Sequence, residues 1–242
     1  MSPRRDWLTF ERHGGSAPPD DEALSLAEDG SFTARRTIGG PSIGAFAGKL
    51  PPAEMNRLRK TVDALGDGGD AEVPTPRHGA TEVLETGRHT LRIGSNEDAP
   101  KPWPALLKRV RAILEDEVLD HPGAAVTLVA DEHGARLEHA GGKAVDVDLG
   151  SLQVRVIHLG ADEAVLGRWS GRPAGALVDN GETMVAKPRW VTAEPGWRED
   201  LPFDHGFRLS GDAWLQVWVD VPIRADGERR AGRLYVPVIP DA

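Results

Sequence analysis

The spacing of apolar side chains changes character along this 242-residue chain at His121-Pro122. Before that point, two segments repeat apolar residues at the spacing of a helix, three or four positions apart. After it, short apolar runs separated by turn residues predict strands alone. The two helical stripes are Met55, Leu58, Val62 and Leu65 in the first helix, and Leu106, Leu107, Val110, Ile113, Leu114 and Val118 in the second.

Strand patterns accompany these two helices in the first half. The alternating segment from Trp7 to Arg12 predicts an opening strand. Asp29-Gly30, set between two apolar runs, predicts a hairpin because a tight turn needs positive φ, and Thr86-Gly87 predicts another. The glycine-rich stretch from Gly39 to Gly48 is predicted to be a loop. The first half is therefore expected to be α+β, an antiparallel sheet with two helices.

The change in periodicity predicts two domains. Residues 1–120 would form the α+β domain, and residues 123–242 an all-β, sandwich-like domain. The second half contains the strongest hairpin signal of the chain, Asp179-Asn180-Gly181. One alternative stays open at the boundary, because the strand Val126 to Val129 could finish the first sheet instead of starting the second.

Composition narrows the classes of function. The net charge of −9 argues against nonspecific binding to nucleic acid or to anionic membranes, which needs dense positive charge. The chain has no cysteine, which excludes disulfides, thiolate catalysis and cysteine-ligated zinc. No apolar run approaches the roughly 20 residues of a membrane span, and no signal peptide is visible. We therefore expect a cytoplasmic protein of bacterial type.

Histidine and carboxylate groups offer three weak catalytic or metal-binding patterns. His133 and His139 could face each other across a hairpin, but a polar turn explains them better. Asp146 and Asp148 point to one face of a strand, which could bind calcium but is expected to be solvent-exposed. Asp204-His205 and Ser210 lack the Gly-x-Ser-x-Gly elbow of a serine hydrolase. No catalytic residue, metal or cofactor is predicted.

Two features suit binding to a protein partner. Ile43 and Phe46 would be apolar contacts in the predicted Gly39 to Gly48 loop, which lacks the Gly-Lys-Ser/Thr ending of a phosphate-binding loop. The chain also has seven tryptophans against one tyrosine. Core packing is the favoured interpretation of Trp214 and Trp218, whereas Trp197 beside Pro195-Gly196 is expected to contact a partner.

The first half resembles the emfourin family, small bacterial inhibitors of thermolysin-like metalloproteases. The resemblance rests on Arg12-His13-Gly14-Gly15 after the first strand, on Leu50-Pro51-Pro52-Ala53-Glu54 before the first helix, and on the order of later elements. It covers just under half of the chain. Two departures are Ser16 to Asp20 directly after the glycines and a longer segment before Leu50. The resemblance implies loop-geometry roles for Gly14 and Gly15.

The sequence thus predicts a non-catalytic protein-binding protein, possibly inhibitor-like by that resemblance, which binds through loops of its first domain. The partner-binding residues would be Gly14, Gly15, Ile43, Phe46 and Trp197. Two alternatives stay open. One is an accessory or assembly subunit of a larger bacterial complex, which docks through the sandwich edge or Trp197. The other is a metal-assisted hydrolase that uses histidines and carboxylates.

Overall fold

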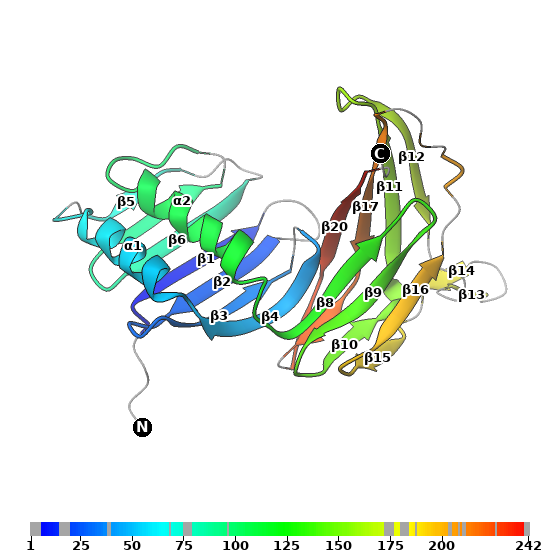
Figure 1. Cartoon of the computed structure of the whole chain (residues 1–242), viewed down its shortest axis with the longest axis horizontal. Helices are drawn as coiled ribbons and strands as arrows, with labels where there is room; N and C mark the ends of the chain where they lie inside the picture. Colours follow the sequence, from blue (N-terminus) through cyan, green and yellow to red (C-terminus); the bar gives the residue numbers. More distant parts are fainter. Residues whose placement is uncertain are drawn as a thin grey trace. The chain divides into compact units, whose positions relative to one another are not determined.

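The computed structural model is mostly β, with two α-helices and several antiparallel sheets in its described part (Figure 1). Contacts within the chain divide it into two compact units. The first is Met1–Arg36 with Ala45–Pro122, and the second is Thr37–Gly44 with Gly123–Ala242. The described residues are 6–14, 20–37, 40–67, 69–74, 79–95, 97–171, 177–179, 184–186, 188–202, 205–207, 209, 212–225 and 227–239.

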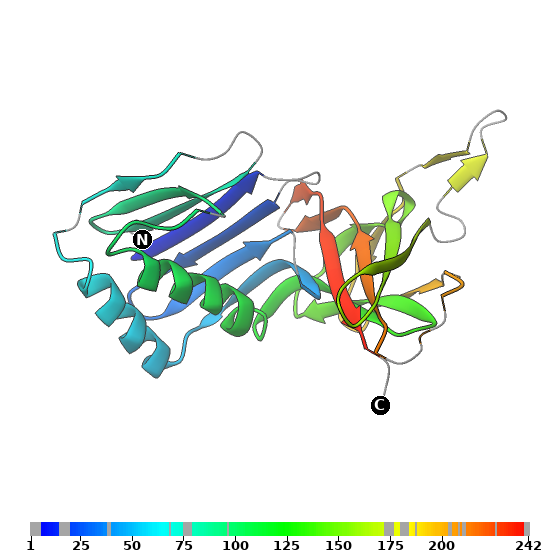
Figure 2. The same ribbon diagram turned by 90° about the horizontal axis from the view of Figure 1, so that it is seen from above.

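The first unit has one sheet whose face is covered by the helices α1 and α2 (Figures 1 and 2). Its strands run in the order β4-β3-β2-β1-β6-β7-β5, and β5 pairs with β7 in parallel. The elements are β1 (Leu8–Gly14), β2 (Asp20–Leu26), β3 (Ser31–Arg36), β4 (Ser42–Lys49), α1 (Pro52–Asp63), β5 (Ala71–Glu72), β6 (Ala80–Thr86), β7 (Thr90–Gly94), α2 (Pro104–Ala112) and the π-helix η1 (Ile113–Glu117).

The hairpin and the first helix of this unit agree with the sequence. Strands β2 and β3 pair around Asp29-Gly30, and Gly30 has the positive φ of 84° that the turn requires. Helix α1 begins directly after Pro51, as expected for a first turn whose N–H groups lack helical partners. Met55 and Leu58 of α1 are buried. Both predictions are therefore confirmed.

The second helix is not a single α-helix. Helix α2 ends at Ala112 and continues as η1, in which the Val118 N–H donates to the Ile113 carbonyl, 3.0 Å away. This bond reaches five residues back, so the Leu114 carbonyl loses the Val118 N–H that an α-helix would supply. The Arg36 guanidinium donates to that carbonyl instead, with a distance of 3.0 Å from Nη1. A strand side chain thus supports the change of helix type.

Arg36 also ends a row of alternating charges, which we call the charge ladder, on the helix-covered face of the sheet. Arg12 pairs across the strands with Glu22 at 2.7 Å and with Glu82 at 2.9 Å. Glu22 in turn pairs with Arg36 at 2.9 Å, and Glu82 with Arg111 of α2 at 2.6 Å. Glu82 is fully buried and each of its oxygens receives two hydrogen bonds. The ladder therefore ties four strands to the second helix.

The second unit consists of strands and one short 3₁₀ turn in its described part, in agreement with the strand pattern of the sequence. Strand β9 pairs with β8 and β16, and the other sheets have the orders β12-β11-β17-β20, β15-β10-β18-β19 and β13-β14. The elements are β8 (Pro122–Ala130), β9 (Gly134–Gly141), β10 (Val145–Asp148), η2 (Leu149–Ser151), β11 (Gln153–Leu159), β12 (Val165–Gly171), β13 (Leu177–Asp179), β14 (Met184–Ala186), β15 (Trp190–Ala193), β16 (Arg198–Pro202), β17 (Trp214–Asp220), β18 (Ile223–Ala225), β19 (Glu228–Arg230) and β20 (Arg233–Val238).

The predicted loop from Gly39 to Gly48 is wrong for most of its length, because Ser42–Lys49 is the strand β4. Ile43 and Phe46 are 0% and 2% exposed. In the second unit, a Cβ at Gly232 would lie 2.3 Å from Ile43 Cδ1, so this side chain packs directly on backbone. Phe46 belongs to the core of the first unit. Neither side chain is available as a surface contact, because each is buried in the core of its own unit.

Two further observations bear on the sequence predictions. The hairpin at Asn180-Gly181 lies outside the described residues, although β13 and β14 pair on either side of it. None of the helices within the described residues has the length and apolar character needed to cross a membrane.

Replacing Glu82 is expected to destabilise the first unit strongly. Glu82→Ala leaves Arg12 and Arg111 without their shared carboxylate, and breaking a buried ion pair costs about 3 kcal/mol of the free energy of unfolding. Glu85→Ala on the same strand is the control, because Glu85 is exposed and should change stability by less than about 0.5 kcal/mol. Urea denaturation measures both. Equal effects of the two substitutions would show that the ladder is not a stabilising element.

Candidate functional site

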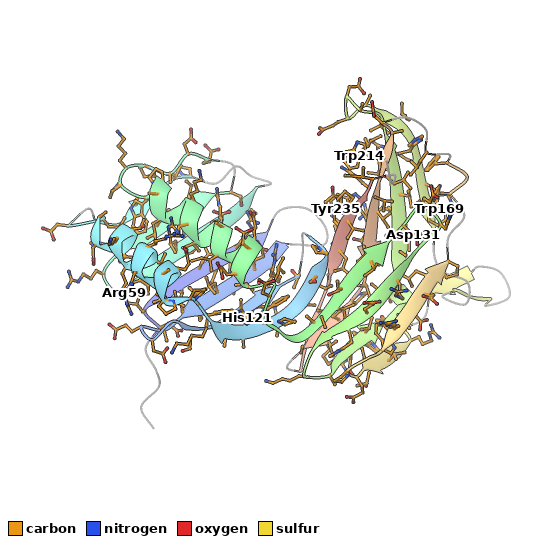
Figure 3. The ribbon with its side chains drawn as sticks, in the orientation of Figure 1. Arg59, His121, Asp131, Trp169, Trp214 and Tyr235 are labelled. Atoms are coloured by element: carbon orange, nitrogen blue, oxygen red, sulfur yellow. The ribbon has the colours of Figure 1, made fainter. Side chains whose placement is uncertain are left out.

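The sheet β12-β11-β17-β20 has one apolar face and one mixed face. Val217 and Val219 of β17 are buried, whereas Trp214, Gln216 and Trp218 alternate with them and are half-buried. The prediction that Trp214 and Trp218 fill the core is therefore wrong. By this alternation they lie on the face that we call the outer face; Figure 3 labels Trp214 of this strand.

The strand register brings complementary residues to this outer face. Trp218 lies opposite Arg155 of β11 and Tyr235 of β20. Arg155 in turn lies opposite Ser170 of β12. The Trp218 and Tyr235 rings are 4.6 Å apart between centroids and are tilted by 35°. Residues far apart in the sequence thus form a continuous aromatic and polar surface.

A hollow of about 400 Å³ opens on this surface. We call it the arginine–tryptophan hollow. A volume of this size falls within the range of small-ligand pockets, roughly 300–1,000 Å³. Its lining consists of Arg155, Val156, Ile157, Arg168, Trp169, Ser170, Trp218 and Arg233.

Positive charge exceeds negative charge in this lining. Asp220 accepts a hydrogen bond from Arg155 Nη2 at 2.5 Å and one from Arg233 Nε at 2.6 Å. Arg168 is exposed, and no ion pair of its guanidinium is found among the described residues. Arg155 Nε and Trp218 Nε1 are buried and have no hydrogen-bond partner in the described part of the chain. The hollow therefore presents cationic groups beside an aromatic ring, with two unsatisfied donors buried in its wall.

The pKa of Tyr235, which packs against Trp218, is shifted by its surroundings beside the hollow. Its pKa is raised above 10.0, mainly because burial disfavours the phenolate and also because the Glu163 carboxylate repels it. Glu163 lies in the turn between β11 and β12 and has an unusual positive φ of 62°. Acidic charge that acts on Tyr235 thus contrasts with the guanidinium groups that line the hollow.

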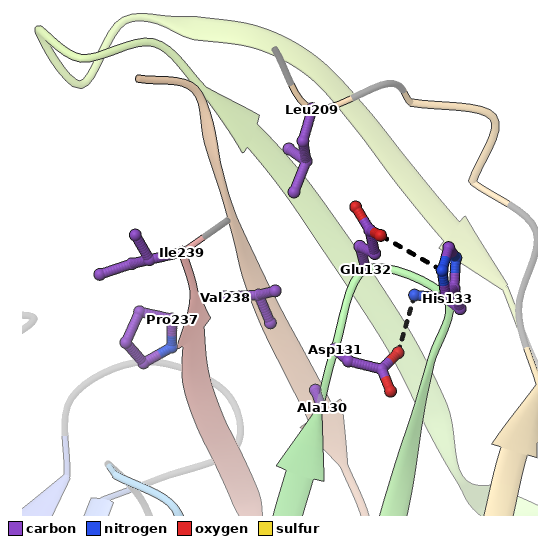
Figure 4. Close-up of a pocket in the computed structure, with 8 residues that line it drawn as sticks. All are labelled: Ala130, Asp131, Glu132, His133, Leu209, Pro237, Val238 and Ile239. Carbon is purple, nitrogen blue, oxygen red and sulfur yellow. Dashed lines mark hydrogen bonds and ion pairs between the residues drawn. The ribbon is translucent and has the colours of Figure 1, made fainter. Parts of the chain in front are cut away.

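A second hollow of about 480 Å³ lies beside the turn between β8 and β9 (Figure 4). Asp131 Oδ1 accepts the N–H groups of His133 at 2.8 Å and Gly134 at 2.9 Å, and Glu132 pairs with His133 at 3.2 Å. The opposite wall is apolar and includes Ile239, which is 73% exposed. Because Asp131 is occupied in holding the turn, this site offers little free chemistry. The polar turn that the sequence predicts at His133 is what the structure shows.

The structure does not gather the predicted partner-binding residues into one site. Gly14 ends β1 with a φ of 90°, and Gly15 lies outside the described residues. Ile43 and Phe46 are core residues, as shown above. Trp197 is half-buried and ends a turn in which its N–H donates to the Glu194 carbonyl at 2.8 Å, with Pro195-Gly196 at the corner. Of the five, Trp197 alone keeps a side chain at the surface within the described part.

The candidate catalytic and metal-binding residues have other partners. His139 Nε2 contacts the Lys143 carbonyl at 2.8 Å. Asp148 is fully buried, contrary to the predicted exposed face, and accepts hydrogen bonds from the Gly150 N–H, the Ser151 hydroxyl and the Arg189 N–H. Asp204 and Ser210 lie outside the described residues. Across the described part of the chain, no group of three or more histidine, cysteine, aspartate or glutamate residues could hold a metal ion.

Sequence reasoning missed the arginines of the hollow, because Arg155, Arg168 and Arg233 are isolated along the chain. A usable signal was the alternation in β17, where Trp214, Gln216 and Trp218 share a face that could not belong to the same core as Val217. Searches against protein-family models and against characterised proteins match this chain to none of them. The resemblance to emfourins therefore stays a prediction.

The ionisation of Tyr235 should begin at higher pH than that of a free phenol. Because the chain has one tyrosine, phenolate absorbance reports this residue alone. We expect a midpoint above pH 10.0 in the native protein and a lower one in Glu163→Gln, though still raised by burial. The unfolded chain loses this proton first, so the free energy of unfolding should fall as pH rises beyond 10.0. Tyr235→Phe should remove the part of this fall in the free energy of unfolding that is due to the phenol. A midpoint at or below pH 10.0 in the native protein would contradict a raised pKa of Tyr235.

Proposed function

We propose that this protein is a non-catalytic binding protein that recognises a partner protein through the outer face of the sheet β12-β11-β17-β20. The observation that carries the proposal is the arginine–tryptophan hollow, with Trp218 packed against Tyr235 and three arginines in its lining. Tryptophan, tyrosine and arginine are the residues most enriched at the energetic centres of protein interfaces. Their side chains stand on paired strands, which lowers the cost of ordering a binding surface.

This proposal shifts recognition away from the first-half loops that the sequence suggested. Burial of Ile43 and Phe46 takes two of the five expected contacts out of the surface. Trp197 stays a candidate contact of the second unit. We also propose the finer organisation that the sequence suggested, an α+β domain followed by a β-sandwich domain. Inhibition of a protease by the first half stays a prediction that rests on the emfourin resemblance.

A photo-crosslinking experiment tests the proposal. The chain has no cysteine, so Ser170→Cys provides a unique attachment point on the exposed outer side of β12. A crosslinker there should capture a defined protein from the native lysate, because a partner seated in the hollow lies beside Ser170. Thr33→Cys, exposed on β3, is the matched control and should capture less of the same protein.

Two results would count against the proposal. Capture from Thr33 but not from Ser170 would place recognition on the first unit. Capture from neither position would remove the support for a protein partner. The same experiment with Arg168→Ala added to Ser170→Cys should reduce capture, whereas Arg88→Ala, which changes an exposed arginine of the first unit, should not.

A second candidate function, an assembly subunit, is favoured by the edge strand β12. This strand is the last of its sheet and exposes Val165 by 48% and Leu166 by 59%. Exposed apolar edge strands favour pairing with another chain. The assembly function that the sequence left open would use this edge.

A charge on the edge strand should separate these two functions. If β12 mediates self-association, Leu166→Lys should shift the protein to a smaller species in size-exclusion chromatography with light scattering, because a lysine disfavours edge-to-edge pairing. Capture of a partner from Ser170 should then persist in the same variant. A wild-type protein that is monomeric at all concentrations would contradict self-association through β12.

A further inference from the structure

We infer that the arginine–tryptophan hollow takes an acidic, extended peptide segment of a partner protein, which rests on the proposed function. The hollow unites a local excess of positive charge, unsatisfied donors, an aromatic wall and a neighbouring sheet edge. Each feature selects a different property of the ligand.

The positive charge of the hollow favours an anionic ligand. Arg155, Arg168 and Arg233 line the hollow, and Asp220 is the carboxylate that bonds two of them. Among the described residues, the three guanidinium charges less the one carboxylate leave a surplus of two, and counting Glu163 near Tyr235 still leaves one. This surplus occurs in a chain of net charge −9, so it is a local feature and not a consequence of overall composition. Guanidinium groups bind carboxylates through paired, charge-assisted hydrogen bonds.

Unsatisfied donors select a ligand with acceptor oxygens. Arg155 Nε and Trp218 Nε1 are buried without a hydrogen-bond partner among the described residues. Buried donors without partners are uncommon in folded proteins because each forfeits its bonds to water. The Arg155 side chain as a whole is 38% exposed, and its Nη2 atom is held by Asp220. A ligand carboxylate or carbonyl can thus supply an acceptor that the described chain does not.

The aromatic wall and the sheet edge select a peptide over a small anion. An inorganic anion would engage the guanidinium groups but leave the faces of Trp218 and Tyr235 uncovered, whereas apolar side chains of a peptide would cover them. Arg168 and Ser170 both belong to β12, the last strand of its sheet. An extended segment can pair its backbone with such an edge while alternate side chains enter the neighbouring hollow.

Titration calorimetry on the full chain tests this inference with two blocked peptides of equal length. One alternates glutamate and leucine, and the other alternates glutamine and leucine. We expect the acidic peptide to bind and the neutral one to bind at least about tenfold more weakly, which corresponds to about 1.4 kcal/mol. Arg168→Ala should weaken the acidic peptide by a similar factor, whereas Arg88→Ala should leave its affinity unchanged.

The single tyrosine locates the bound peptide. Negative charge in the hollow should raise the pKa of Tyr235 further, which phenolate absorbance detects without interference from other tyrosines. Arg168 is exposed, so we expect Arg168→Ala to leave the thermal unfolding transition unchanged. Measuring that transition verifies that the variant is folded. A bound acidic peptide that leaves the Tyr235 titration unchanged would place the peptide elsewhere and overturn the inference.

Other ligands are outcomes of the same experiment. Equal affinities for the acidic and neutral peptides, or no effect of Arg168→Ala, would overturn the assignment of an acidic segment. Binding of a short polygalacturonate through Arg168 without binding of the acidic peptide would replace the peptide by an acidic sugar. Capture of a protein from Ser170 together with failure of the acidic peptide would leave the proposed function standing and overturn this inference alone.

Discussion

The two-residue period of the β-strand is the constraint on which the rest of this structure depends. Side chains at alternate positions point to opposite faces, so an apolar residue buried on one face commits its neighbours to the other. In β1, burial of Leu8 and Phe10 places Arg12 on the same helix-covered face, where it meets Glu22 and Glu82. In β17, burial of Val217 and Val219 places Trp218 on the outer face. Both the charge ladder and the hollow follow from this alternation.

The charge ladder and the hollow are both built from arginines and carboxylates, but these groups are paired differently in the two places. In the ladder, Glu82 is buried and satisfied on both oxygens, so each guanidinium has a fixed partner and the network ties sheet to helix. In the hollow, Arg155 and Arg233 share one carboxylate while Arg168 is exposed. A network in which every guanidinium is paired with a carboxylate stabilises a fold, whereas an exposed arginine without an ion pair among the described residues, next to an aromatic ring, is suited to a ligand. This difference in pairing, more than the presence of arginine, distinguishes the hollow from the charge ladder.

Arg36, a side chain on a strand, donates a hydrogen bond to a carbonyl of the π-helix η1. Turns of π-helix cost hydrogen-bond geometry and are rare, so each needs compensation. Here the Leu114 carbonyl accepts from Arg36, which is held by Glu22 in the ladder. The acidic residues Glu115, Asp116 and Glu117 fall within this turn. The structure does not explain their unfavourable position near a helix C-terminus.

The sequence by itself determined the local elements, because these depend on neighbours in the chain. Periodicity located both helices, and Asp29-Gly30 located a hairpin through the positive φ of Gly30. Prediction from the sequence failed where contacts between distant segments of the chain determine the structure. The glycine-rich stretch around Ile43 and Phe46 reads locally as a loop, but pairing as β4 makes it a buried strand. Only the tertiary structure could unite Arg155, Arg168, Trp218 and Arg233, since strand register, which no local pattern encodes, brings them together.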